Sequence, residues 1–122
     1  MKQVLLVFVG GGIGSVARYL LGKLLNSPSD GIPYGTFVAN ILGSLIIGII
    51  LGLAARNETL TQSQTLLLAT GFCGGFTTFS TFAYENHLFL KSGDFTSFAF
   101  YTVASFVLAF LAVFGGIYLS KL

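Results

Sequence analysis

The residues with the most distinctive chemistry lie in one apolar stretch, residues 71–82, which reads GFCGGFTTFSTF. Three glycines and a Thr-Thr pair stand here where an ordinary membrane-spanning helix carries Leu, Ile and Val. Glycine permits non-helical dihedral angles and leaves backbone groups uncovered. Non-helical backbone at membrane depth is tolerated only where protein buries it or water lines it. The stretch therefore predicts a helix that is broken within the membrane, and the break is the expected functional part.

The composition predicts an integral membrane protein. Of the 122 residues, 54% are hydrophobic and only 8% are charged, whereas roughly 25% of residues are charged in soluble domains. Residues 3–25, 34–55, 62–90 and 95–120 form four apolar runs, each long enough for the ~20 residues of one crossing. We expect one all-α domain over residues 1–122, with four transmembrane helices and a third helix broken in the middle. With no basic cluster in the sequence, nothing indicates a nucleic-acid partner.

Asn40, Phe79 and Phe82 are the first candidates for a pore. Asn40 lies on a stripe of small residues in the second run, and an asparagine there is costly unless it has a partner. It either bonds to another helix or presents its amide to a pore, and the chemistry of the third run favours the pore. Phe79 and Phe82 are three residues apart, so they share one helix face.

Hydroxyl residues extend the candidate set along the third and fourth runs. Ser80 and Thr81 project to other faces of the turns that carry the phenylalanines. Tyr101 and Ser105 share one stripe of the fourth run because they are four residues apart. That stripe indicates either a sparse polar track or ordinary packing of small residues, and the fourth run alone does not distinguish them.

Two charged residues are further candidates. Arg18 lies on a stripe with Gly10, Gly14 and Gly22, and small residues on a stripe let helix backbones approach closely. Arg18 either reaches the membrane interface or is buried and functional. Glu85 lies one turn beyond Thr81, near the end of the third crossing.

Basic residues are nearly balanced between the two expected sides of the membrane. The side of the termini carries Lys2, Arg56 and Lys121, and the other side carries Lys23 and Lys91, with Arg18 nearby. The positive-inside rule needs a clear imbalance to fix one orientation. Insertion both ways up therefore becomes possible, and with it an antiparallel homodimer. Its two-fold axis would bring identical backbone carbonyls together at the break, and carbonyl oxygens suit hard cations.

Three motifs resemble those of the CrcB/Fluc fluoride channels. Residues 71–82 resemble the family signature, residues 11–19 the motif of its first helix, and residues 35–44 the motif of its second helix. The resemblance covers essentially the whole chain, and the segment count and loop placement agree with the family.

The resemblance implies a dual-topology antiparallel homodimer in the cell membrane, with two pores that export toxic fluoride passively from the cytoplasm. It implies a central structural sodium ion held by the backbone carbonyls of Gly74 and Thr77 from each chain. At Ala109, where some relatives carry a hydroxyl, this chain has none. The pore lining that the resemblance implies comprises Asn40, Phe79, Phe82, Ser80 and Thr81, with Tyr101 and Ser105 where the family pattern is looser.

These residue types suit fluoride, which holds water tightly. A pore must replace that water with donors that do not trap the ion, and an amide, hydroxyls and the positive edges of aromatic rings are such groups. No nucleophile–base pair, ATP site or metal-ligand cluster is evident, so we expect no enzymatic activity. The alternatives are a small dual-topology exporter of drugs or cations, which would need a glutamate that residues 3–25 lack, and a helical subunit without transport.

Overall fold

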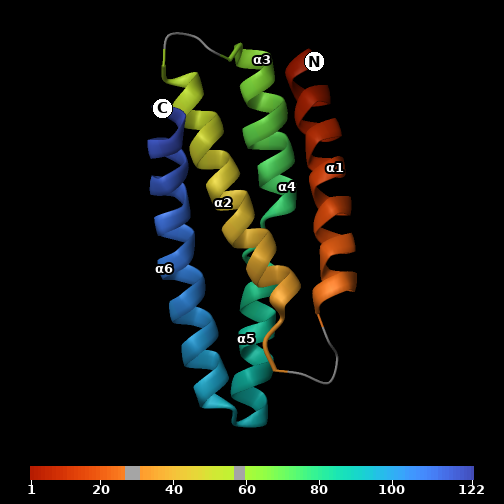
Figure 1. Ribbon diagram of the computed structural model, residues 1–122. Coiled ribbons are helices and arrows are strands. Elements are labelled where there is room, and N and C mark those ends of the chain that lie inside the picture. The colour runs from red at the N-terminus through yellow and green to blue at the C-terminus, as the bar shows by residue number, and fades with distance from the viewer. Residues whose placement is uncertain (27–30, 57–59) are drawn as a thin grey trace.

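The computed structural model describes residues 1–26, 31–56 and 60–122. All regular structure in these residues is helical, and the helices run side by side (Figure 1). The two termini lie at the same end of the molecule (Figure 1). The elements are α1 (Lys2–Leu25), α2 (Tyr34–Ala54), α3 (Gln62–Thr65), the π-helical η1 (Leu66–Cys73), α4 (Gly74–Phe76), α5 (Ser80–Ser92) and α6 (Phe95–Ser120).

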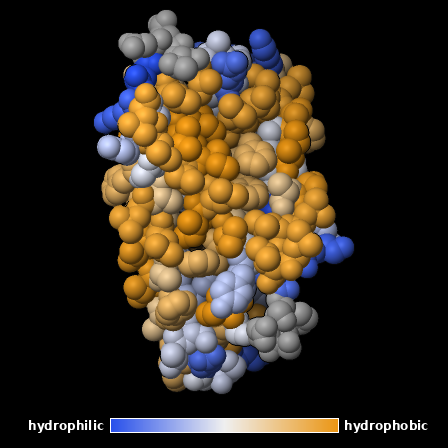
Figure 2. Space-filling model, viewed as in Figure 1, coloured by the Kyte–Doolittle hydropathy of each residue, from blue (hydrophilic) through white to orange (hydrophobic). Residues whose placement is uncertain are grey.

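Four helical segments of the described chain are long and apolar enough to cross a membrane, and they are Lys2–Leu25, Tyr34–Ala54, Gln62–Ser92 and Phe95–Ser120. This confirms the prediction of an all-α protein with four spans. Hydrophobic side chains cover the middle of the visible face, and hydrophilic residues gather at its two ends (Figure 2). Such a surface matches a hydrocarbon layer with polar regions on both sides.

The third span is interrupted, but the glycines do not make the interruption. Helix continues through η1 and α4 as far as Phe76, Thr77 is extended (φ −88°, ψ 156°), and α5 begins at Ser80. The predicted break within residues 71–82 is therefore confirmed, but it follows the glycines, so glycine conformational freedom is not its cause. The unwound segment consists of Thr77, Thr78 and Phe79.

Two glycines before the break, Gly71 and Gly75, serve a different purpose, which is close contact with α1. A Cβ on Gly71 would lie 3.0 Å from the Gly10 Cα, and a Cβ on Gly75 would overlap the Gly11 carbonyl. On α1, a Cβ at Gly14 would overlap the Phe72 carbonyl. The predicted stripe of close packing on α1 is thus confirmed at Gly10 and Gly14. Since lipid removes the hydrophobic drive between helices, this backbone contact and its dispersion energy hold the pair together.

α2 and α6 also approach closely. A Cβ on Gly48 would overlap the Val113 carbonyl, and one on Gly116 would overlap the Leu45 carbonyl. By contrast, α5 packs on α6 through larger side chains, with Phe82, Phe89 and Tyr101 forming a buried cluster. The third span therefore leaves α1 and joins α6 as it passes the break (Figure 1).

Candidate functional site

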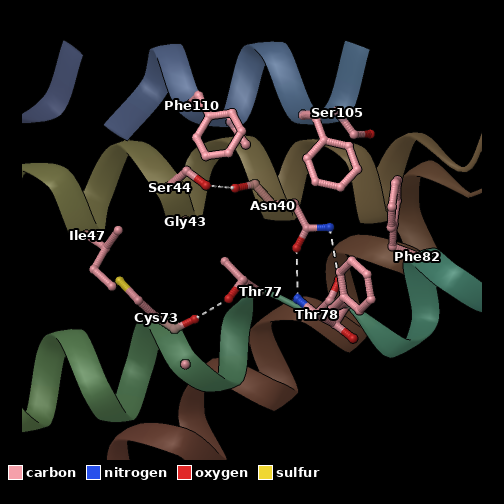
Figure 3. A pocket seen from close by; sticks show the side chains of 14 residues that line it. Asn40, Gly43, Ser44, Ile47, Cys73, Thr77, Thr78, Phe82, Ser105 and Phe110 are labelled. Carbon is pink, nitrogen blue, oxygen red and sulfur yellow. Dashed lines mark hydrogen bonds between the residues drawn. The ribbon is translucent and has the colours of Figure 1, made fainter. Parts of the chain in front are cut away.

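A groove of about 500 Å³ opens at the break, between α2, the unwound segment and α6 (Figure 3). It receives residues from all three. Its lining comprises Asn40, Gly43, Ser44, Ile47, Cys73, Gly74, Thr77, Thr78, Phe79, Phe82, Ser105, Phe106, Ala109 and Phe110.

Asn40 holds the unwound backbone at Thr78. Its Oδ1 accepts from the Thr78 N–H at 2.8 Å, and its Nδ2 donates to the Thr78 carbonyl at 3.1 Å (Figure 3). In a continuous helix the Thr78 N–H would bond to the Gly74 carbonyl. Asn40 takes that carbonyl's place. An amide has two N–H groups, so Asn40 keeps one for another acceptor while it joins α2 to the break.

Arg18, on α1, supplies a hydrogen-bond donor just before the break. Its Nε donates to the Gly75 carbonyl at 3.1 Å. The regular helical donor to that carbonyl would be the N–H of Phe79, which lies in the unwound segment. Asn40 thus replaces the acceptor that the Thr78 N–H lost, and Arg18 replaces the donor that the Gly75 carbonyl lost.

The remaining groups at the break are partly satisfied within the chain. The Cys73 carbonyl accepts from both the backbone N–H and the Oγ1 of Thr77, at 3.0 and 2.8 Å. The Thr78 Oγ1 accepts from the Thr81 N–H at 3.3 Å and so helps to begin α5. Gly74 is exposed in the single chain and lines the groove, as does Thr77. Within the described ranges no cluster of His, Cys, Asp and Glu is able to hold a metal.

Phe79 and Phe82 are neighbours with very different surroundings. Their ring centroids are 5.8 Å apart at an interplanar angle of 46°. Phe82 is only 6% exposed and packs against Tyr101 and edge-on against Phe106. Phe79 is 70% exposed in the single chain. Ring edges carry partial positive charge, so both rings could present an edge to an anion in the groove.

Two hydroxyl groups of α6 lie near the phenylalanines, one without a hydrogen-bond partner in the described chain and one that is hydrogen-bonded. The Ser105 Oγ is buried, lines the groove and has no hydrogen-bond partner in the described chain. The Tyr101 hydroxyl instead donates to the Glu85 Oε1 at 2.7 Å, while the Thr36 Oγ1 donates to the Glu85 Oε2 at 2.7 Å. Glu85 therefore ties α2, α5 and α6 together. The sequence analysis missed Thr36, although it lies one turn before Asn40 on the same helix face.

The predicted site residues divide into two groups. Ser80 is exposed with its Oγ 3.5 Å from the Thr78 Oγ1, and the Thr81 N–H donates to the same Oγ1, but neither residue is part of the groove lining. Thr78, which the sequence analysis did not assign a role, does line it, and its place beside Thr77 was the available signal. The groove brings together Asn40, Gly74, Thr77, Phe79, Phe82 and Ser105, whereas Ser80, Thr81, Tyr101, Arg18 and Glu85 lie outside its lining.

Known proteins resemble this chain along its whole length. Residues 5–117 match the family described as CrcB-like protein, Camphor Resistance (CrcB). A protein of Gloeothece citriformis is 52% identical, with 99% of this chain and 98% of the relative covered. One of Phocaeicola vulgatus is 46% identical (99% and 100% covered), and one of Chlorobaculum tepidum is 44% identical (100% and 97% covered). All three are named "Fluoride-specific ion channel FluC". The resemblance found in the motifs is confirmed, and the chain is a multi-pass membrane protein that belongs to the CrcB-like family.

Proposed function

We propose that this chain is a fluoride channel, through which fluoride leaves the cytoplasm passively and toxic accumulation is prevented. The observation that carries the proposal is the identity of 52% to a relative named as a fluoride-specific ion channel, over 99% of this chain. The fluoride channel is therefore assigned through the relatives, and the groove at the break supplies the chemistry.

The groove offers donors without fixed positive charge. Its described lining contains neither Lys nor Arg. The second N–H of Asn40, the unpartnered hydroxyl of Ser105 and the edges of Phe79 and Phe82 are available to an anion. The N-terminal end of α5, where helix dipoles are positive, also lies at the break. Weak donors of this kind replace bound water without trapping the ion.

The channel is a homodimer with antiparallel subunits and two pores. Support comes from the near balance of basic residues, which permits both orientations. Reporters for both compartments, fused to the C-terminus, should each give a signal. A signal from one compartment alone would contradict the antiparallel arrangement.

We infer that a sodium ion would lie between the two breaks, where the carbonyls of Gly74 and Thr77 from each chain would hold it. Asn40 supports this inference, because it binds the Thr78 N–H that would otherwise occupy the Gly74 carbonyl. Uncharged carbonyl oxygens suit a hard cation. Such an ion would supply a favourable field for an anion and would link the two subunits.

Fluoride efflux from proteoliposomes, followed with a fluoride electrode, tests the proposal. We expect rapid fluoride loss and chloride retention. Proton-coupled uptake of organic cations without fluoride efflux would instead identify an exporter. Absence of both activities in liposomes that contain folded protein would identify a subunit that does not transport.

A further inference from the structure

Arg18 lies outside the groove, but it contacts the break directly. It stands one turn after Gly14, on the face of α1 that packs against the backbone of η1 and α4. Its Nε meets the Gly75 carbonyl in the last turn before the break. The glycines on this face bring the α1 backbone close to η1 and α4, and from there the Arg18 head reaches the Gly75 carbonyl.

The contact is favourable for two physical reasons. The last carbonyls of a helix have no donors within the helix, and a basic side chain both bonds to them and complements the negative end of the helix dipole. Arg is the suitable residue, because its guanidinium is planar and weakly hydrated, whereas the Lys ammonium is a strongly hydrated point charge.

The consequence concerns which carbonyls remain free. Cys73 accepts two bonds from Thr77, and Gly75 accepts from Arg18. The Gly74 carbonyl has lost its helical donor to Asn40. Occupation of the carbonyls on either side therefore leaves Gly74 as the acceptor that a cation would meet.

We propose that Arg18 is a positioning residue that occupies the Gly75 carbonyl and so reserves the Gly74 carbonyl for the central cation. This inference rests on the proposed channel and its sodium ion. It also explains how a fixed positive charge is kept beside the pathway without entering it, since the bond to Gly75 anchors the guanidinium on the α1 side of the break.

The test compares three variants of the full-length protein with the wild type. Arg18→Met removes the charge and the donor but keeps a long stem, and Arg18→Lys keeps a charged donor but loses the planar guanidinium. Lys23→Met is the matched control, because Lys23 lies in the last turn of the same helix and contacts the ring of Tyr19 instead of the break.

Two quantities are measured, amide hydrogen exchange over residues 74–79 and the sodium concentration that gives half-maximal fluoride efflux. For Arg18→Met we expect exchange to accelerate and the sodium requirement to rise, each by roughly tenfold, as for a lost hydrogen bond to a charged group. Arg18→Lys should be intermediate, and Lys23→Met should match the wild type. If Arg18→Met does not fold, Arg18→Lys decides the matter by the same two measurements.

The outcomes separate the inference from the function on which it rests. Equal behaviour of the Arg18 and Lys23 variants would overturn the role of Arg18 while wild-type fluoride efflux still supported the channel. Wild-type efflux that ignores sodium would overturn the reservation of Gly74 for a cation. A wild type without fluoride efflux would overturn the proposed function, and the exchange measurement would still report whether Arg18 fixes the break.

Discussion

Residues 62–76, before the break, pack on α1 through bare backbone, whereas residues 80–92, after it, pack on α6 through aromatic rings. Before the break, glycines on both helices permit contacts that any Cβ would disturb. After it, Phe82 and Phe89 surround Tyr101, and Glu85 receives hydroxyl donors from α2 and α6.

The difference explains why the span can change direction at Thr77. Each half is fixed to a different neighbour, so the unwound residues between them need to satisfy only their own polar groups. Asn40 does this for Thr78 from α2, and Arg18 binds the Gly75 carbonyl at the end of the preceding helix from α1. Unwound backbone at membrane depth is stable under that condition, and the same condition leaves groups free for ions.

Substitutions at the junction of the two halves should have the largest effect on fluoride flux. Asn40→Asp removes the donor to the Thr78 carbonyl and places an acceptor-only group beside it. We expect fluoride flux in liposomes to fall by at least roughly tenfold, as for loss of a hydrogen bond and the second donor. Gln64→Glu is the control, because it makes the same chemical change in an exposed capping box that accepts either residue. Normal flux in Asn40→Asp would reduce Asn40 to a packing role.

The contact between α1 and the half before the break should tolerate no added atoms, because backbone meets backbone there. Gly14→Ala should destabilise the fold by about 1–3 kcal/mol, since the new Cβ meets the Phe72 carbonyl and the Phe76 N–H. Gly12→Ala should instead stabilise α1 by about 0.5–1 kcal/mol, because its Cβ meets nothing and alanine favours helix. Denaturant unfolding in detergent, followed by circular dichroism, measures both, and equal effects would contradict the backbone contact.

Substitutions of the two phenylalanines at and after the break should distinguish effects on stability from effects on fluoride flux. Phe82→Ile should lower both the unfolding free energy, by about 1 kcal/mol, and the fluoride flux, because the ring is buried against Tyr101. Phe79→Ile should lower flux with a stability change within about 0.5 kcal/mol, since its ring is exposed in the single chain. Flux at the wild-type level in both variants would remove the ring edges from the pathway.

The smallest effect is expected at the start of α6, outside the membrane spans. Asp94 accepts from the Ser97 N–H at 3.1 Å, and hydrogen bonding by Ser97 lowers the pKa of this carboxyl. A pKa that is lower in the folded state stabilises the protein above the unfolded pKa, and that stability is lost as the pH falls through the folded pKa. Asp94→Asn should keep the cap and abolish this acid dependence. A persistent acid dependence in thermal unfolding would assign it to another group.

Much of the fold follows from the sequence alone. The four apolar runs predict four spans correctly, because the thickness of the membrane sets the length of one crossing. The stripe of Gly10 and Gly14 gave a contact face because helix periodicity aligns residues four apart. Ser80 and Thr81 were expected in the lining because they match hydroxyl residues of the family's pore, but they are not among the residues that line the groove of the single chain.

What the sequence by itself determined is the set of parts, namely four spans, a weak point in the third, and uncharged donors near it. Only the tertiary structure decided where the helix stops and which carbonyls stay free. The reason is that both depend on bonds from distant side chains: Asn40 lies 38 residues from Thr78, and Arg18 lies 57 residues from Gly75. Local pattern cannot contain that information, because an unwound turn is stable only where other helices bring it partners.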